Sequence, residues 1–561
     1  MAAACATALG VSSISVARVV PAQRIPADGR TPKLVVLLVV DQFRADYIDM
    51  YRSQWSRGLH RLVTEGAWFR QANYPYFNTV TCPGHVSVST GAVPALHGIV
   101  LNNWWDRSVA KMVTCTEDDR YTAITYGRPV TGGGESTTRL LLPTLADELR
   151  AQRSPPAHTV AFSLKARSAI TLGGRKPDAV VWFDDSGSWM TSSAFSSGPV
   201  PAVAEFVQRN PVEHDLGRTW DLSLAPDAYL YENPAVGVRA AKGGMTASFP
   251  HVLTGAAGAP DRMFYDQWQS SPFADEYLAR MALGVAESMH FGTLPGPNLI
   301  AIGFSTLDKV GHDYGPNSHE VQDILLRLDR TLGDFFAGLD RLVGSGQYTI
   351  ALTADHGVAP VPERSVEEGF DAGRVRLETL TAVAEEALTK VLGAGKHITT
   401  FVHDYFYLEP GVYEKLQANP AAMRSLLADL TRAPGVLRAY SRDDLESDRF
   451  MDDTVGRQAA LSYFPGRSGD VMLVWKPYWI ESASATTHGS GYQYDTHVPV
   501  LLMGRGIAAG EYLESASPTD IAPTLAFLAG VTLPRVSGRV LTEALTRTAP
   551  ATARKPGSAG Q

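Results

Sequence analysis

Short apolar runs recur along the chain, and each is rich in branched side chains and ends in polar or glycine-containing sequence. Runs of this length and composition predict β-strands. Since they lack the polar alternation of a half-exposed strand, they indicate strands buried on both faces, as in a parallel sheet covered by helices. The predicted parallel strands are Leu34–Val40, Thr159–Phe162, Asn298–Phe304, Tyr348–Thr353 and Val498–Met503.

Helical periodicity occurs between some of these runs. Apolar side chains recur at helical spacing through Ser318–Val343, which predicts an amphipathic helix with one buried face. A second helix is expected to begin near Pro518 and Asp520 and to end before Gly530, a residue suited to a C-cap. Strands that alternate with helices place the chain in the α/β class, with a mostly parallel central sheet flanked by helices on both faces.

Two stretches interrupt this alternation, and we expect both to be insertions that cap the sheet near the site. Residues 199–295 are rich in Pro, Gly, Asp and Trp and show little periodicity. Residues 363–478 contain helical segments of their own, such as Glu378–Leu392 and Pro420–Thr431. The sequence therefore predicts one catalytic domain over 31–540 that carries both insertions.

The two ends of the chain are expected to lie outside that domain. Residues 1–30 begin with a stretch rich in Ala, Val and Ser that lacks a basic start and a leucine-rich core. We interpret it as a weak or truncated signal peptide ending near Ala22, with a disordered cytoplasmic tail as the alternative. Residues 541–561 are predicted to be a disordered tail. No later segment has the length and apolar character of a membrane span.

Charge and cysteine content narrow the functional class. The net charge of −8 provides no basic excess, so nucleic-acid binding is not expected. The chain has 3 cysteines, Cys5, Cys82 and Cys115, which are too few for a cysteine-rich zinc fold. Any metal must therefore be held by histidines and carboxylates. Nothing in the composition specifies an oligomeric state.

Aspartates and histidines follow the predicted strands, where ligands collect in open α/β sheets. Each alone is more often a turn former or a helix N-cap than a ligand, but so many at one sheet edge point to a metal centre. Imidazole with carboxylate favours zinc over calcium or magnesium, and two zinc ions suit in-line displacement at phosphorus. The candidate ligands are Asp41, Asp308, His312, Asp355, His356 and His488.

A nucleophile is expected in the segment Asn78–His85, which we predict to be a loop before a helix with Pro83 as its first residue. Thr81 in such a position is normally only a cap, but near zinc it becomes a candidate alkoxide because the metal lowers its pKa. Cys82 is a rival nucleophile. We favour its pairing with Cys115 in a disulfide if the protein is exported; otherwise it is a small buried residue. The histidine that ends the segment is interpreted as structural.

The sequence resembles the alkaline phosphatase superfamily, in its type I phosphodiesterase/nucleotide pyrophosphatase branch. It is most similar to the bacterial phosphate-irrepressible alkaline phosphatases that use threonine. The resemblance covers roughly residues 32–195, 296–360 and 484–540. Its motifs are VVDQFRADY from Val39, NTVTCPGHVSVSTG from Asn78, HGIVLNNWWD from His97, SLKARSAI from Ser163, STLDKVGHDYG from Ser305, TADHG from Thr353 and THGSGYQYDTHVP from Thr487.

The resemblance implies two zinc ions and assigns their ligands. It implies that one zinc is held by Asp41, Thr81, Asp355 and His356. It implies that the second zinc is held by Asp308, His312 and His488. His488 is preferred to His497, the fallback, because the family ligand directly precedes a glycine and Gly489 follows His488.

The resemblance also implies that Asn102, Lys165 and Arg167 contact the phosphoryl group, and that Thr81 is the nucleophile. A monoester dianion carries more charge on its non-bridging oxygens than a diester, and Lys and Arg supply charge-assisted hydrogen bonds to that charge. Lys165 and Arg167 are two residues apart and would point the same way in extended backbone. An arbitrary pair of this kind is usually solvated, but within the family it separates monoesterases from diesterases.

The expected function is therefore that of a periplasmic or secreted zinc-dependent alkaline phosphatase. It would hydrolyse small phosphate monoesters through a covalent phosphothreonine at Thr81. The main alternative is a phosphodiesterase or nucleotide pyrophosphatase on the same two-zinc core. The same residues would also suit a phosphotransferase or mutase, or a metal-binding module without enzymatic activity.

Overall fold

The computed structural model of this chain describes residues 31–546 except 129–132, 240–241 and 451. The predicted signal peptide and residues 547–561 of the predicted tail lie outside the described residues. Ahead of them the chain stays packed, since Leu541 and Ala544 are fully buried. The folded domain therefore continues past residue 540, and its last residues were wrongly assigned to the tail.

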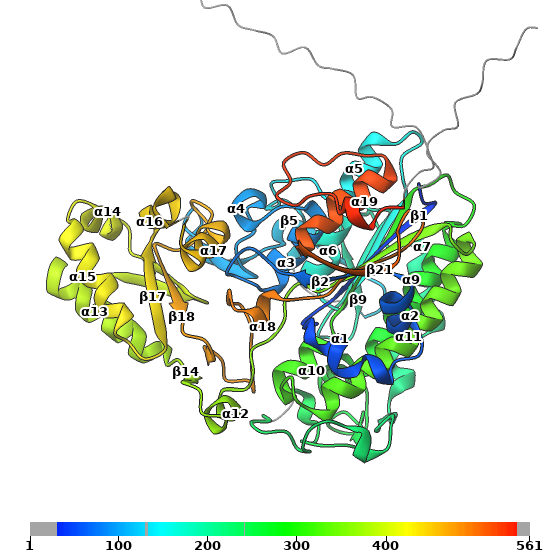
Figure 1. The fold of residues 1–561 in the computed structure, drawn as a ribbon, viewed down its shortest axis with the longest axis horizontal. Helices are drawn as coiled ribbons and strands as arrows, with labels where there is room; N and C mark the ends of the chain where they lie inside the picture. The colour runs from blue at the N-terminus through cyan, green and yellow to red at the C-terminus, as the bar shows by residue number, and fades with distance from the viewer. Residues whose placement is uncertain (1–30, 129–132, 240–241, 451, 547–561) are drawn as a thin grey trace, which may run out of the picture.

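An 11-stranded sheet forms the centre of the described structure, in the order β21-β2-β20-β13-β1-β12-β7-β8-β9-β5-β6 (Figure 1). The strands are β1 (Leu34–Val40), β2 (Ala67–Ala72), β5 (Glu117–Thr125), β6 (Gly133–Glu135), β7 (Thr159–Ser163), β8 (Ala179–Phe183), β9 (Trp189–Ser192), β12 (Asn298–Phe304), β13 (Tyr348–Thr353), β20 (Val500–Gly504) and β21 (Gly510–Ala516). The α/β class and the central sheet are as predicted.

The strands in the middle of the sheet are parallel. β1 pairs in parallel with β12 and β13, β12 with β7, and β7 with β8. The last predicted strand is different, because β20 runs antiparallel to both β13 and β2. The prediction of a parallel strand at Val498–Met503 is therefore wrong in direction. An apolar run reports burial on both faces, which is the same for either direction.

Side chains of β1 alternate between two cores. Leu34, Val36, Leu38 and Val40 join one apolar cluster with α1 (Asp46–Tyr51), α2 (Gly58–Glu65), α9 (Pro272–Ser288) and α11 (His319–Val343). Val35, Leu37 and Val39 join a second cluster with α3 (Thr81–Thr90), α5 (Leu145–Gln152), α6 (Ala166–Gly173) and α19 (Ile521–Ala529). The two sets of helices thus cover opposite faces of the sheet (Figure 1).

Two predicted helices have a boundary where the sequence suggested, one at its start and one at its end. Ser318 is the N-cap of α11, and its side chain accepts a hydrogen bond from the Val321 N–H. Gly530 ends α19 with a φ of 69°, a left-handed conformation that favours glycine.

Residues 199–295 are less irregular than the sequence indicated. They contain α7 (Pro201–Arg209), α8 (Arg262–Gln269), the two-stranded antiparallel sheet of β10 (Thr219–Trp220) and β11 (His251–Val252), and helix α9. α9 packs on α11, β12 and β7, so it belongs to the layer that covers the sheet. Its apolar side chains surround much of the helix, so the sequence shows no narrow apolar stripe there.

Residues 363–478 form a lobe of their own beside the part of the molecule that holds the main sheet (Figure 1). A four-stranded sheet has the order β15-β16-β18-β17. Its strands are β15 (Ile398–Val402), β16 (Tyr405–Leu408), β17 (Val436–Ser441) and β18 (Val471–Trp475), and its helices include α13 (Leu377–Leu392), α14 (Val412–Gln417), α15 (Pro420–Thr431), α16 (Arg442–Glu446) and α17 (Thr454–Ser462).

This insertion contacts the segment that precedes Thr81. Asn78 Nδ2 donates hydrogen bonds to both carboxylate oxygens of Asp404, each at 3.1 Å. The Phe77 and Asn78 N–H groups both donate to Ser462 Oγ. The insertion thus fixes the backbone segment that leads into the candidate nucleophile.

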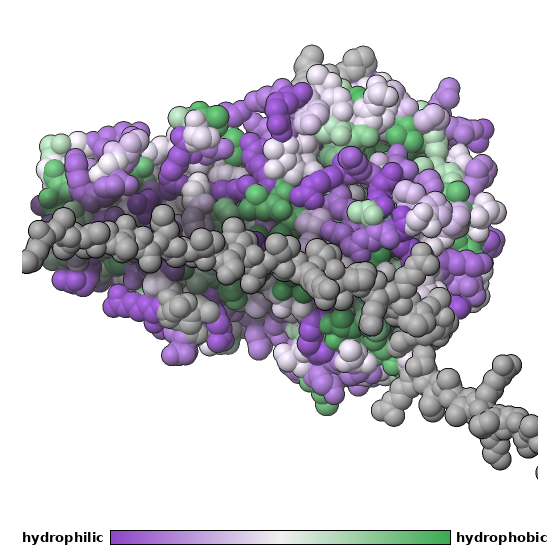
Figure 2. Space-filling model, turned by 90° about the horizontal axis from the view of Figure 1, so that it is seen from above, coloured by the Kyte–Doolittle hydropathy of each residue, from purple (hydrophilic) through white to green (hydrophobic). Residues whose placement is uncertain are grey.

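No helix in the described part of the chain is long and apolar enough to cross a membrane. The face drawn in Figure 2 is mainly hydrophilic where its residues are coloured, with small apolar areas between.

Candidate active site

Four neighbouring parallel strands, β13, β1, β12 and β7, end at the same edge of the sheet. Asp41 follows β1 directly, and Asp355 and His356 follow β13. Helix α10 (Thr306–Tyr314) follows β12 and α6 follows β7. The carboxyl ends of adjacent parallel strands are where open α/β sheets place their ligands. The topology therefore brings the predicted ligands together.

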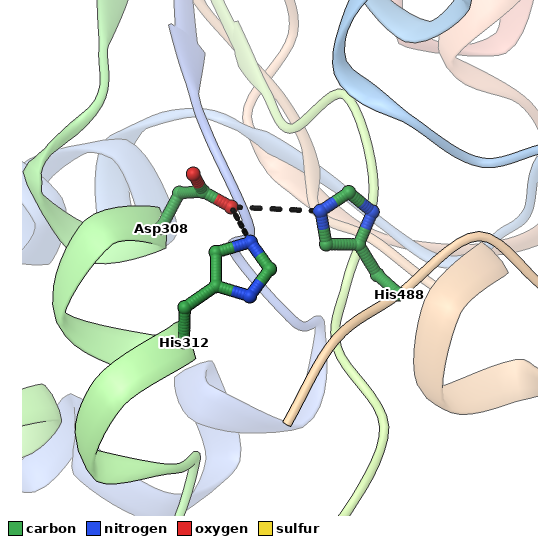
Figure 3. A group of neighbouring side chains, drawn as sticks. All are labelled: Asp308, His312 and His488. Carbon is green, nitrogen blue, oxygen red and sulfur yellow. Dashed lines mark ion pairs between the residues drawn. The ribbon is translucent and has the colours of Figure 1, made fainter. Parts of the chain in front are cut away.

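The first candidate metal group consists of Asp308, His312 and His488. Asp308 Oδ1 lies 3.2 Å from His312 Nε2 and 3.6 Å from His488 Nε2 (Figure 3). The other ring nitrogen of each histidine lies 2.9 Å from a backbone carbonyl, that of Thr486 for His312 and that of Thr79 for His488. A proton on Nδ1 leaves the Nε2 lone pair for a metal, so these carbonyls orient both rings as ligands.

The second candidate group consists of Asp41, His356 and Asp308, the last shared with the first group. His356 Nε2 lies 3.3 Å from Asp41 Oδ1 and 3.3 Å from Asp355 Oδ2. Among the described residues Asp41 Oδ1 and His356 Nε2 are buried and make no hydrogen bond. Such unpaired buried polar atoms are costly unless a ligand satisfies them. The residues present therefore fit a divalent cation at each group.

Burial and neighbouring charges shift the pKa values of the candidate ligands in different directions. Burial, followed by the charges of Asp308 and Asp355, raises the pKa of Asp41 well above its usual range. Burial alone would also raise the pKa of Asp308, but Lys165 and two histidines hold it well below its usual value. Burial and the neighbouring rings of His356 and His312 lower the pKa of His488. A neutral imidazole is the form that binds metal.

Lys165 lies between the two groups. Its Nζ is within hydrogen-bonding distance of Asp41 Oδ2 and of Asp308 Oδ2. Burial acts to lower the pKa of Lys165, but the two carboxylates outweigh it and raise the pKa. Lys165 therefore remains charged at the junction of the two groups.

The sequence analysis assumed one extended segment for Lys165 and Arg167, and the structure shows this only at Lys165, because the chain turns into a helix directly after it. Lys165 is the N-cap of α6 and Arg167 lies in the first turn of that helix. Both residues line a cavity of about 500 Å³ together with Asp308, His312 and Gln269. The pair thus reaches the site from a helix N-terminus.

Thr81 begins helix α3, with Val80 as its N-cap. The predicted loop is therefore helical two residues earlier than expected, and Pro83 is the third helical residue. Gly84 allows the first turn to pack directly on the site, since a Cβ there would lie 2.3 Å from the Asp355 carbonyl oxygen. Thr81 is 1% exposed.

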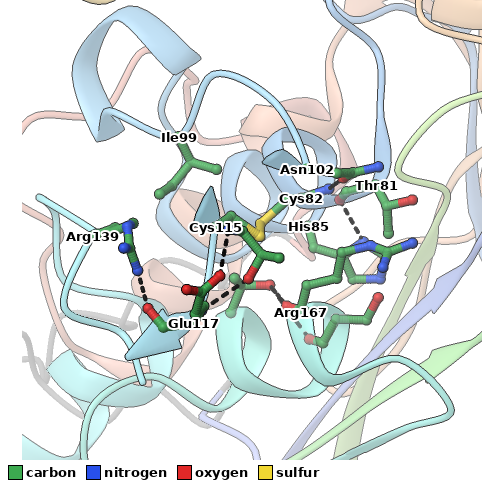
Figure 4. The surroundings of a disulfide bond; sticks show 12 residues. Thr81, Cys82, His85, Ile99, Asn102, Cys115, Glu117, Arg139 and Arg167 are labelled. Carbon is green, nitrogen blue, oxygen red and sulfur yellow. Dashed lines mark hydrogen bonds between the residues drawn. A yellow bond between two sulfur atoms is a disulfide. The ribbon is translucent and has the colours of Figure 1, made fainter. Parts of the chain in front are cut away.

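Asn102 lies beside the same helix end, and its Oδ1 accepts a hydrogen bond of 2.7 Å from the Cys82 N–H. Cys82 and Cys115 form a disulfide, which confirms the favoured pairing. Cys82, the rival nucleophile, therefore has no free thiol in this structure. Figure 4 shows Thr81, Asn102 and Arg167 together in the surroundings of this disulfide.

The profile of the family described as type I phosphodiesterase / nucleotide pyrophosphatase matches residues 35–497 of the chain. The chain belongs to this family.

Relatives of this type I phosphodiesterase family member include alkaline phosphatases. Alkaline phosphatase PhoV of Synechococcus elongatus is 31% identical over 92% of this chain and 93% of its own length. Alkaline phosphatase PafA of Elizabethkingia meningoseptica is 31% identical over 92% of this chain and 95% of its own. The crystal structure of wild-type alkaline phosphatase PafA matches with a TM-score of 0.84 at 30% identity, covering 92% of this chain and 99% of that one. The chain is a hydrolase of the alkaline phosphatase kind with a candidate two-metal site.

In this family member the fallback ligand His497 lies apart from both metal groups. Its Nε2 is 2.8 Å from the Arg70 carbonyl oxygen, and its backbone bridges to Asn73. Of the two candidates in the last motif, only His488 reaches Asp308.

Two residues that hold the ligands of this family member were not predicted from the sequence. Gln42 donates from Nε2 to Asp308 Oδ1 at 2.9 Å and from its backbone to Asp355 Oδ1 at 3.2 Å. Asp495 Oδ2 accepts from the Gly489 and Ser490 N–H groups and so shapes the loop after His488. The available signal was that both residues lie within the motifs that carried the resemblance.

Proposed function

We propose that this protein hydrolyses phosphate monoesters through a covalent phosphothreonine at Thr81. Thr81 begins α3 at the edge of the sheet where the two candidate metal groups lie. A helix N-terminus favours negative charge, which supports an alkoxide at Thr81 and the phosphate that it would accept. The alkaline phosphatases among the relatives support the same reaction class.

The donor set supports zinc as the metal. We propose that Asp41, Asp355 and His356, with Thr81, hold one ion, and that Asp308, His312 and His488 hold the other. When bound, two zinc ions would supply Lewis acidity for the attacking and leaving oxygens. The buried carboxylates and neutral imidazoles of this chain are the ligands that zinc prefers.

The chain's own residues would carry the rest of the reaction. The Thr81 oxygen attacks phosphorus in line with the departing alcohol, forming phosphothreonine. Water then attacks the phosphothreonine from the side that the alcohol has left, which releases phosphate and restores Thr81. Asn102, Lys165 and Arg167 donate hydrogen bonds to the non-bridging oxygens, which carry most of the charge.

The position of Lys165 and Arg167 is the observation that favours a monoester over a diester as the substrate. Both cations lie at the N-terminus of α6 and line the 500 Å³ cavity together with Asp308. A monoester dianion gains charge-assisted hydrogen bonds there that a diester monoanion gains less well. The alternative is a phosphodiesterase, in which this pair would be structural.

The deciding experiment compares kcat/KM for p-nitrophenyl phosphate and bis-p-nitrophenyl phosphate on the zinc-loaded protein near pH 9. We expect a strong preference for the monoester. A preference for the diester would move the function to the phosphodiesterase branch.

We further propose that the protein is exported to the periplasm or secreted. The Cys82–Cys115 disulfide supports this, because such bonds persist in oxidising compartments. Cell fractionation tests it, and retention in the cytoplasm with free thiols would contradict it.

A further inference from the structure

The two cysteines of the disulfide bind Asn102, one at its side chain and one at its backbone. The Cys82 N–H donates to Asn102 Oδ1 at 2.7 Å, and the Cys115 N–H donates to the Asn102 carbonyl oxygen at 2.9 Å. The Cys82–Cys115 bond closes this arrangement covalently. One asparagine thus receives a hydrogen bond from each end of one disulfide (Figure 4).

These contacts determine which way the Asn102 amide faces. Because Oδ1 is engaged by a backbone N–H of α3, the Nδ2 group is the end left to act as a donor. A donor amide beside Thr81 is what a phosphoryl oxygen requires. Reversal of the amide would set Nδ2 against the Cys82 N–H, so the helix end selects the orientation.

Asn102 needs such support because of where it lies in the chain. It sits between the short helix α4 (Pro94–His97) and the hairpin β3 (Asn103–Asp106) and β4 (Lys111–Thr114). The hairpin ends at Cys115, so the disulfide attaches its far end to the first turn of α3. Loop positions are more mobile than the elements that they connect, and a covalent tie reduces that freedom.

We propose that the Cys82–Cys115 disulfide is a positioning device that keeps the Asn102 amide aimed at the phosphoryl group held by Thr81. The inference rests on the proposed function. Cys82 is 0% and Cys115 2% exposed, and both lie in an apolar cluster, so thiols have no access to the bond in the folded protein. The disulfide is therefore a permanent tie and not a redox switch.

The test uses the Cys82→Ala/Cys115→Ala double variant, which removes the tie but keeps both backbone N–H donors. It is compared with Asn102→Ala and with the triple variant that combines all three substitutions. Val113→Ala is the matched control, since Val113 is buried in the same cluster, on β4. Measurements are kcat/KM for p-nitrophenyl phosphate with zinc, melting temperature, and amide hydrogen exchange of peptides covering 81–90 and 99–116.

We expect Asn102→Ala to lower kcat/KM on the order of 10–100-fold, as for loss of a hydrogen bond to a charged group. The double variant should lower it by about 10-fold, and the triple variant should be no worse than Asn102→Ala. Val113→Ala should lower the melting temperature but combine additively with Asn102→Ala. Hydrogen exchange should rise in both peptides of the double variant and less in Val113→Ala.

Two results overturn the proposal. One is additive losses in the triple variant, which would make the disulfide a general stabiliser. The other is unchanged hydrogen exchange in the double variant. Absence of monoester hydrolysis by the zinc-loaded wild type would instead reject the proposed function, and the exchange data would then still decide whether the disulfide holds Asn102.

Discussion

His85 and Asp355 are paired beneath the candidate metal site. His85 Nδ1 lies 3.1 Å from Asp355 Oδ2, and both side chains are fully buried. The same nitrogen lies 2.9 Å from the Thr81 carbonyl oxygen. One imidazole therefore links the first turn of the nucleophile helix to Asp355, a proposed metal ligand.

We expect His85→Ala to weaken zinc binding by about 10–100-fold, the usual cost of losing a residue that orients a metal ligand. Although burial acts to raise it, His356 and then His85 hold the pKa of Asp355 below its usual range, so the variant loses part of this effect. Competition with a chelator measures the change in affinity. His97→Ala is the control, because His97 is equally buried and contacts Ser87 rather than a carboxylate. Equal loss of zinc in both variants would make His85 merely structural.

Replacement of the Thr81 hydroxyl should abolish the phosphoenzyme. In Thr81→Ala no oxygen at this position can attack phosphorus, so labelled phosphate should not become bound to the protein at acid quench. Thr81→Ser keeps a hydroxyl at the helix end and should retain a measurable phosphoenzyme. Mass spectrometry of the quenched protein gives the site. A labelled phosphoenzyme in Thr81→Ala would reject the assignment.

Arg167→Ala should reduce monoester hydrolysis selectively. Loss of a charge-assisted donor to the dianion should lower kcat/KM for p-nitrophenyl phosphate by about 100-fold, with a much smaller loss for the diester. Arg175→Ala is the control, since Arg175 lies just beyond the same helix and pairs with Asp147 on the surface. Equal losses for both substrates would place Arg167 in a general structural role.

The strands were predictable wherever burial alone determines the pattern. β1, β12 and β13 have the predicted bounds, because a strand buried on both faces leaves a continuous apolar run. The direction of β20 was not predictable, since it depends on which neighbours it meets. Helix α9 was missed because its apolar side chains are not confined to one face.

The metal-ligand candidates were partly readable from position after a strand, which is how Asp41 and Asp355 were found. Contacts between side chains from distant segments of the chain could not be predicted in this way. The contact of His85 with Asp355 and that of Gln42 with Asp308 arise only when β1, α3, α10 and β13 meet at one edge. The roles of Asn102 and Arg167 came from the family resemblance, because an isolated polar residue in a loop carries no such signal.

The two histidines of the last motif should behave differently on substitution. His488→Ala removes an imidazole whose Nε2 faces Asp308, so zinc content and kcat/KM should both fall, by 10-fold or more, on the order of the cost of a lost ligand contact. His497→Ala loses a contact with the Arg70 carbonyl oxygen and should mainly lower the melting temperature. Metal analysis after dialysis distinguishes them. Loss of zinc only in His497→Ala would reverse the assignment.

Asp275 should make stability depend on pH. This carboxyl lies in α9 and accepts a hydrogen bond from the Ser305 N–H at the start of α10. Burial raises its pKa to about 7. Between about pH 4 and pH 7 the folded protein therefore binds a proton that the unfolded chain has released. The contribution of Asp275 to the free energy of unfolding is therefore largest at low pH, and it falls as the pH rises towards 7.

Asp275→Asn keeps an acceptor oxygen and cannot ionise. It should raise the melting temperature of the zinc-loaded protein by a few degrees at pH 8, roughly the effect of 2–4 kcal/mol in a chain of this size, and change it little at pH 5. Asp334→Asn is the control, because the Asp334 side chain is 75% exposed and solvent screens its ion pair with Arg57. If the difference between wild type and Asp275→Asn were the same at both pH values, the buried carboxyl would not be the source of the pH dependence.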